Sequence, residues 1–86
     1  MNFAVTVEVS LKPGIADPQG STIERSLPAL GFGGVQGVRV GKLIRFDVDA
    51  ADEHEAERRV RELCDRFLTN PVIEDATIRV EEAAVR

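Results

Sequence analysis

The sequence predicts an α+β fold, a two-layer sandwich with both helices on one face of an antiparallel sheet. Three observations predict it: apolar and polar residues alternate over residues 3–11, a long amphipathic helix pattern covers 51–69, and shorter alternating stretches cover 38–48 and 73–81. With a helix expected after the first strand, the order is strand, helix, strand, strand, helix, strand. A βαββαβ chain most often folds this way, and residues 1–86 suit a single domain.

The first strand is predicted by apolar residues at every second position, which places them on one buried face. They are Phe3, Val5, Val7, Val9 and Leu11.

A helix is expected next, over residues 18–30. Asp17 marks its start as an N-cap, and Pro18 follows at the first helical position, where its missing N–H is not needed. Gly31 suits the C-terminal cap. Because Pro28 removes a hydrogen bond to the carbonyl of Glu24, the last turn should kink or loosen. The inward stripe would be Ile23, Leu27 and Leu30.

The segment 38–43 leaves two interpretations open. Val38, Val40, Ile44, Phe46 and Val48 all occupy even positions, so the apolar alternation passes through Gly41 and Lys42 without changing phase. A two-residue turn would put the last three on the opposite face. A three-residue hairpin loop keeps all five on one face. So does a single strand, bent at Gly41, that runs past its own sheet and pairs with another subunit. In both cases Gly41 is predicted to shape the backbone.

The second helix is predicted from apolar residues at helical spacing: Ala56, Val60, Leu63, Cys64, Phe67 and Leu68. Asp49 or Asp52 can cap its start, and Asn70 with Pro71 stops it. On its polar face glutamate precedes arginine by four residues at Glu55-Arg59, Glu57-Arg61 and Glu62-Arg66. Each such pair stabilises a helix by about 0.3 kcal/mol. The last strand, over 73–81, should bury Ala76, Ile78 and Val80.

Composition excludes several classes of function. The net charge is −4, which argues against non-specific binding to nucleic acid or to an anionic membrane. No apolar run could span a bilayer, and the start of the chain lacks the pattern of an export signal. A single cysteine, Cys64, can form neither an intrachain disulfide nor a cysteine-based metal site. We therefore expect a cytoplasmic protein without nucleic-acid or membrane partners.

No catalytic constellation and no metal site is predicted. His54 lies among glutamates at a helix start, as solvated histidines do, and Cys64 lies on the apolar stripe of its helix. No nucleophile, base and oxyanion site combine. Many unrelated activities use ferredoxin-like sandwiches, so the fold alone names no function. An RNA-binding version needs exposed aromatic residues, and this chain has no Tyr or Trp.

Three short segments combine a backbone-shaping glycine or proline with polar groups that a plain core does not need. They are Asp17-Pro18-Gln19-Gly20, Val38-Arg39-Val40-Gly41-Lys42-Leu43 and Asn70-Pro71-Val72-Ile73-Glu74. With Lys12 and Leu30-Gly31-Phe32, in this order and near these spacings, they resemble the PurS family, the small subunit of phosphoribosylformylglycinamidine synthase. The resemblance spans nearly the whole chain. Pro28 and Gly33-Gly34 depart from the family pattern, and both affect local shape.

The resemblance implies a non-catalytic subunit that joins two partners in purine biosynthesis. In that family a synthetase subunit uses ATP and magnesium to activate the amide oxygen of formylglycinamide ribonucleotide, and a glutaminase subunit releases ammonia from glutamine. The small subunit would bridge them, would need no cofactor of its own, and would form a dimer or a tetramer.

The residues expected to contact partners are Asp17, Gln19, Gly20, Arg39, Gly41, Lys42, Asn70 and Glu74. An N-cap role alone would explain Asp17, and a helix-stop role would explain Asn70. For Arg39 and Lys42, plain solvation explains the sequence as well as a partner does.

Two other classes of function remain open from the sequence. An ACT-like regulatory domain that senses a small molecule shares the topology and also dimerises edge to edge. A small stand-alone enzyme would need catalytic groups supplied across an interface.

Overall fold

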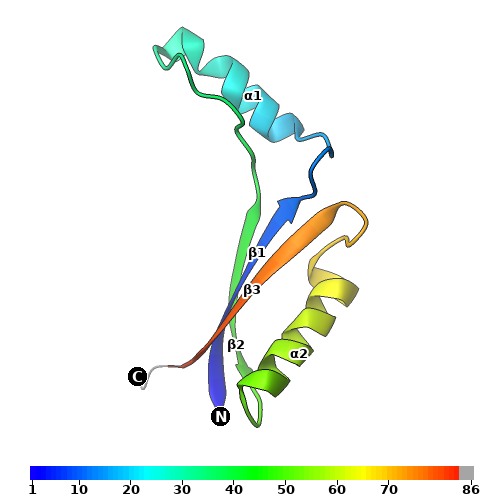
Figure 1. Cartoon of the computed structure of the whole chain (residues 1–86). Coiled ribbons are helices and arrows are strands. Elements are labelled where there is room, and N and C mark those ends of the chain that lie inside the picture. The colour runs from blue at the N-terminus through cyan, green and yellow to red at the C-terminus, as the bar shows by residue number, and fades with distance from the viewer. Residues whose placement is uncertain (84–86) are drawn as a thin grey trace.

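A three-stranded antiparallel sheet forms the centre of the computed structural model, which describes residues 1–83 (Figure 1). Strand β1 (Asn2–Leu11) lies in the middle, between β2 (Lys42–Asp49) and β3 (Glu74–Glu82). The pairing is continuous, with Val5 opposite Phe46 on one side and opposite Val80 on the other. The predicted α+β fold with an antiparallel sheet is confirmed.

Helix α2 (Glu53–Leu63) covers one face of this sheet and continues as a π-helical turn, Cys64–Leu68. Asp52, rather than Asp49, is its N-cap and accepts a hydrogen bond from the Glu55 N–H at 2.8 Å. The three predicted Glu-Arg pairs form, at N–O distances of 3.9, 3.7 and 3.0 Å along the chain.

The core lies between β1 and α2. Its fully buried members alternate along β1 and recur every four residues along the helix: Val5, Val7, Val9, Val60 and Cys64, with Phe3, Ala50 and Ala56 at one end. Ala76, Ile78 and Val80 pack against this core from β3, as expected, but are only partly buried. Leu63 and Phe67, predicted to be part of the helix stripe, are instead 39% and 80% exposed.

Helix α1 (Pro18–Ser26) stands beyond the end of the sheet instead of covering it (Figure 1). The expectation that both helices cover one face is therefore wrong for the single chain. Pro28 ends the regular helix, and a 3-10 turn (Pro28–Leu30) follows. Gly31 closes that turn at φ 91°, where its N–H donates to the Pro28 carbonyl and the Phe32 N–H to the Leu27 carbonyl.

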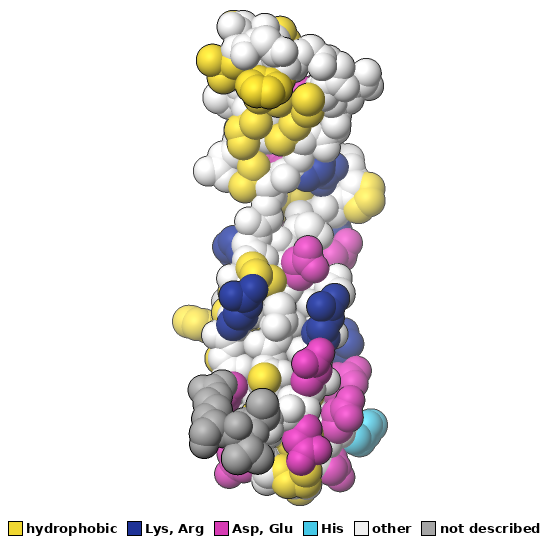
Figure 2. Space-filling view, turned by 90° about the vertical axis from the view of Figure 1, so that its left-hand side faces the viewer, with side chains coloured by type: hydrophobic (Ala, Val, Ile, Leu, Met, Phe, Trp, Pro, Cys, Tyr) yellow, Lys and Arg dark blue, Asp and Glu magenta, His cyan; other side chains and the backbone are white. Residues whose placement is uncertain are grey.

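The apolar stripe of α1, which continues from Ile23 into Leu27 and Leu30 of the turn after the helix, is covered neither by the sheet nor by α2 within residues 1–83 (Figure 1). Ile23 is 45% and Leu30 69% exposed. Figure 2 shows hydrophobic side chains gathered at this end of the molecule. The molecule measures 52 × 32 × 15 Å, with a radius of gyration of 16.8 Å. A compact domain of this length would have a radius of gyration of about 12 Å, so this fold is markedly extended.

The fourth strand of the predicted order does not form within residues 1–83, and neither does the hairpin. Residues 35–41, which we call the arm, run from α1 straight into β2 without reversing (Figure 1). The backbone geometry is that of the second interpretation, a strand that overruns its own sheet. None of the helices in the described residues is long and apolar enough to cross a bilayer.

Candidate functional site

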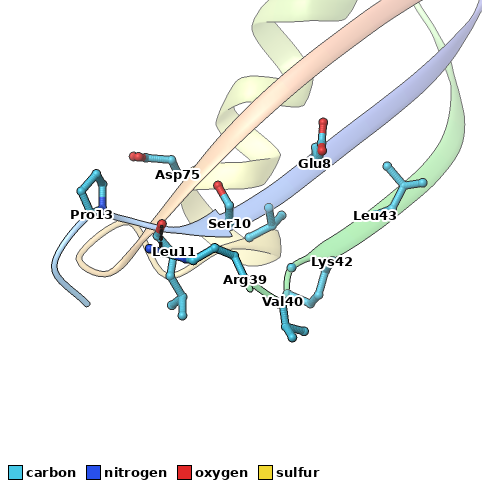
Figure 3. Close-up of a pocket in the computed structure, with 11 residues that line it drawn as sticks. Glu8, Ser10, Leu11, Pro13, Arg39, Val40, Lys42, Leu43 and Asp75 are labelled. Atoms are coloured by element: carbon cyan, nitrogen blue, oxygen red, sulfur yellow. Dashed lines mark hydrogen bonds between the residues drawn. The ribbon is translucent and has the colours of Figure 1, made fainter. Parts of the chain in front are cut away.

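The three segments singled out in the sequence meet where β1 ends and the arm enters β2. The loop before α1 contacts the arm through Asp17, and the segment that leads into β3 contacts the start of β2 through Glu74 and Lys42, although these residues lie far apart in the chain. A groove of about 670 Å³ lies beside this meeting point, between the end of β1 and residues 39–43. Figure 3 shows the residues that line it.

Asp17 joins α1 to the arm. One carboxylate oxygen, Oδ1, accepts the Gly20 N–H at 2.9 Å, which confirms the predicted N-cap. The other, Oδ2, accepts the Val40 N–H at 2.8 Å and lies 3.9 Å from Arg39 Nε. The side chain is only 11% exposed. The hydrogen bonds from Gly20 and Val40, with the charge of Arg39, hold the pKa of Asp17 below its ordinary value against the opposing effect of burial.

Glu24 makes a second contact of the same kind, which the sequence reasoning missed. Its Oε1 accepts the Val38 N–H at 2.9 Å. Glu24 follows Asp17 by seven residues, so both lie on one face of a helix, and Val38 and Val40 are two apart, so their amides point to one edge of a strand. These two spacings in the sequence are the signal from which the two contacts could have been predicted. The two carboxylates take the place of a neighbouring strand along this edge of the arm.

Two glycines allow this close packing. Gly20 is buried, and a side chain there would collide with the Val38 carbonyl. At Gly41 a Cβ atom would lie 2.6 Å from the Val9 carbonyl oxygen. Gln19, by contrast, is exposed on the first turn of α1, beside Ile23 and Val40.

Arg39 ties the arm to the end of β1. Its Nη2 donates to the Leu11 carbonyl at 3.1 Å, and half of its side chain remains exposed in the groove (Figure 3). Plain solvation is therefore not its whole role. Whether it also contacts a partner stays a prediction.

The turn before β3 joins the same end of the sheet. Asn70 Oδ1 accepts the Val72 N–H at 3.1 Å, and Glu74 Oε1 accepts the Asn70 N–H at 2.8 Å. Glu74 Oε2 lies 3.9 Å from Lys42 Nζ, which connects this turn to the start of β2. Beside it, Lys12 and Asp75 form an ion pair at 2.6 Å.

All eight predicted partner-contact residues thus lie at this end of the sheet, and all except the exposed Gln19 help to shape its connections. None of these contacts forms a catalytic arrangement. Elsewhere in residues 1–83, His54 is exposed on the first turn of α2, and Cys64 is buried in the core. Burial raises the pKa of the Cys64 thiol, which disfavours the thiolate that a nucleophile requires. The arrangement can position backbone and present surfaces to a partner.

Comparison with known proteins gives a consistent result. The family model of PurS, phosphoribosylformylglycinamidine (FGAM) synthase, matches residues 4–82. The PurS subunit of Bacillus subtilis phosphoribosylformylglycinamidine synthase is 37% identical, over 98% of this chain and 99% of its own. That of Methanocaldococcus jannaschii is 39% identical, over 93% and 96%.

Solved structures agree in fold. The crystal structure of M. jannaschii PurS, described as one of the subunits of formylglycinamide ribonucleotide amidotransferase in the purine biosynthetic pathway, superposes with a TM-score of 0.85 at 38% identity. It covers 95% of this chain and 99% of its own. A chain of PurLQS from Thermotoga maritima gives 0.85 at 32% identity, covering 93% and 98%. From the family match over residues 4–82, the chain belongs to the PurS family of FGAM synthase subunits.

Proposed function

We propose that this chain is a non-catalytic PurS subunit that dimerises through its arm and joins the synthetase and glutaminase subunits of FGAM synthase in the cytoplasm. Membership of the PurS family supports the role in purine biosynthesis, and the similarity to a chain of PurLQS supports assembly with other subunits. The regulatory ACT-like alternative is not favoured. One observation carries the proposal. The strand formed by the arm and β2 has an open edge, and the apolar stripe of α1 is uncovered, so both lack a neighbour within residues 1–83.

The arm and β2 together form one long strand, and the edge of this strand that points away from β1 is open. The Ala50 N–H donates to the Met1 carbonyl. Because hydrogen bonds in an antiparallel ladder alternate, the backbone N–H and C=O groups of the even-numbered residues of β2 point toward β1. The amides of Leu43 and Arg45 therefore point away from the sheet, in line with those of Arg39 and Gly41 in the arm. Within residues 1–83 these four amides have no hydrogen-bond partner. An open edge of this length is a template for another strand.

The face beside that edge is apolar and incompletely covered. Ile44 and Phe46 of β2 are only partly buried, and Leu63 and Phe67 of α2 are exposed. Arg59 Nη1 donates to the Asp49 carbonyl at 2.5 Å, so the side of α2 that carries Arg59 and Leu63 turns toward β2. These four apolar residues form what we call the β2 trough.

The exposed stripe of α1 fits the β2 trough of a second copy. A two-fold axis near Lys42 would pair the arm of each copy with β2 of the other. It would also bring Ile23, Leu27 and Leu30 over the trough. Such an interface is self-complementary, as a closed dimer requires. It also completes the predicted four-stranded, two-helix sandwich with elements from two chains. Burying a leucine or isoleucine fully contributes roughly 1.5–3 kcal/mol, which makes this stripe a substantial driving force.

Asp17, Gly20, Arg39 and Gly41 would then hold the arm in its outward direction. The exposed parts of Arg39 and Lys42 would remain for a partner subunit. ATP and magnesium would be bound by the synthetase subunit. Holding the arm and contacting a partner subunit require no catalytic group in this chain.

Reconstitution tests the proposal. The synthetase and glutaminase subunits from the same organism are assayed for glutamine-dependent formation of formylglycinamidine ribonucleotide, with and without this chain. We expect activity to disappear when the chain is omitted and to saturate as it is added back. The isolated chain should show no turnover. Equal activity without the chain would refute the bridging role.

A further inference from the structure

The edge of β3 that faces away from β1 is a second open strand edge, separate from the arm. The Ala83 N–H donates to the Asn2 carbonyl, and the Lys12 N–H donates to the Ile73 carbonyl. Because hydrogen bonds in an antiparallel ladder alternate, the backbone N–H and C=O groups of the odd-numbered residues of β3 point toward β1. Those of Ala76, Ile78 and Val80 point away from it. Within residues 1–83 those outward amides meet no acceptor.

Five of the nine residues of β3 are charged, which discourages some partners, but the edge lacks the other features that usually protect one. Strand β3 is nine residues long and contains no proline. Its pairing with β1 is unbroken from Glu82 opposite Phe3 to Glu74 opposite Leu11, so no bulge twists it away. Natural proteins usually shorten, bend or cover such edges. The dimer proposed above uses the opposite side of the sheet and leaves this edge open.

A groove of about 310 Å³ runs beside the edge, between β3 and the end of α2. Its floor includes Cys64, Ala76 and Ile78, and Arg61 and Asp65 of the helix line its other side. A strand added to β3 would direct every second side chain toward this floor. The groove therefore accepts apolar side chains at alternate positions of such a strand.

Charge distinguishes between two possible occupants. The most complete pairing of β3 with β3 of a second copy would centre on Ile78. It would place Asp75 opposite Glu81 and Glu74 opposite Glu82, each twice, and like charges directly opposite each other are destabilising, although Lys12 at 2.6 Å from Asp75 and Lys42 at 3.9 Å from Glu74 offset part of this. A Lys or Arg of an added segment would gain attraction opposite Glu81, and opposite Asp75 it would share the carboxylate with Lys12.

We infer that the free edge of β3 is a docking site for an extended segment of a different protein, which adds to the sheet as an antiparallel or parallel strand. The segment carries apolar side chains toward the groove and basic side chains toward Asp75 and Glu81. This inference rests on the proposed function in one respect: a subunit of the synthase would donate the segment. Main-chain hydrogen bonds would hold it, and the alternation of side chains would select it.

Residue-resolved amide exchange by NMR tests the inference. Exchange is measured on the labelled chain alone and in complex with the unlabelled synthetase and glutaminase subunits. We expect the amides of Ala76, Ile78 and Val80 to exchange at least tenfold more slowly in the complex. The amides of Thr77 and Arg79, which already bond to β1, are internal controls and should change little. Unchanged exchange at the three edge amides in a complex that does form would overturn the inference while leaving the proposed function intact.

Two variants separate docking from folding. Ala76→Pro removes an outward N–H and leaves the ladder to β1 in place, a position at which proline is tolerated in edge strands. Glu81→Lys reverses one of the two charges, and Glu53→Lys makes the same change at an exposed glutamate on the first turn of α2 as a control. We expect the first two to weaken binding to the partner subunits at least tenfold, with unchanged circular dichroism and dimer mass, and Glu53→Lys to bind normally.

The remaining outcomes are also decisive. If the edge amides of the isolated chain gain protection as its concentration rises, the occupant is a second copy and the inference is wrong. If the unmodified chain forms no complex with either subunit, the proposed function fails and the inference with it. Normal binding by Ala76→Pro and Glu81→Lys would contradict the inference alone.

Discussion

Replacing Gly41 by alanine should destabilise the protein, because the new methyl group has no room. Its Cβ would lie 2.6 Å from the Val9 carbonyl oxygen, whereas ordinary contacts of this kind are 3.4 Å or longer. That oxygen belongs to the backbone of the central strand, where Val9 is paired with Lys42, so it cannot rotate aside as a flexible side chain could. The arm and the first residue of β2 must therefore shift away from β1.

The expected magnitude follows from two opposing effects. Forcing an extra methyl group into a filled site typically costs about 1–3 kcal/mol. Restricting the unfolded chain by replacing glycine offsets about 0.4–1 kcal/mol of this. We therefore expect the free energy of unfolding to fall by roughly 1–2 kcal/mol and the melting temperature by about 5–15 °C for a chain of this size.

Gly33→Ala is the matched control for this substitution. A Cβ at Gly33 would have no neighbour within 4 Å, and the backbone there does not require positive φ. Here only the effect on the unfolded chain remains, so the variant should equal or slightly exceed the stability of the original protein. Urea unfolding at one fixed protein concentration compares the three proteins. A Gly41→Ala protein as stable as the original would refute the reasoning, as would an equal loss in Gly33→Ala.

Three further predictions concern the helices and the core. Asp52→Ala removes the N-cap of α2, and thermal melting should show a loss of about 1 kcal/mol, whereas Asp65→Ala, which caps nothing, should have little effect. The folded-state pKa of Asp17 lies below its ordinary value of 3.8, so its stabilising effect is complete above that value and is lost as pH falls below it. The stability of the original protein should therefore fall more steeply than that of Asp17→Asn between pH 5 and pH 3 in urea titrations, and parallel curves would contradict this. Cys64 is 2% exposed with a raised pKa, so a thiol reagent at pH 8 should modify the folded protein at least tenfold more slowly than the urea-unfolded chain.

Local structure was largely predictable because it depends on neighbours in the chain. Alternation identified β1, and helical spacing identified α2 with its three Glu-Arg pairs. The N-cap at Asp17 and the glycine cap at Gly31 followed from residue type and position. These features are set by backbone geometry within one or two turns, which a sequence pattern records directly.

The direction of the arm was not predictable, because periodicity does not say which chain supplies a neighbouring strand. The even positions of Val38, Val40 and Ile44 fit a hairpin and an overrunning strand equally well. The structure shows the arm held outward by the carboxylates of Asp17 and Glu24. For the same reason the sequence identified the stripe of α1 as apolar but did not predict that it is uncovered within the described residues. Residues 17, 24, 38 and 40 lie far apart in sequence, and only their joint placement determines the arm.

The most direct test of the account is whether α1 of one copy lies over β2 of another. Copies with labelled methyl groups are mixed with unlabelled copies, and isotope-filtered NMR detects only contacts between chains. The account predicts contacts from Ile23, Leu27 and Leu30 to the Phe46 ring, in a particle with twice the 9.4 kDa mass of the chain. A particle of 9.4 kDa, or a dimer without these contacts between chains, would contradict it.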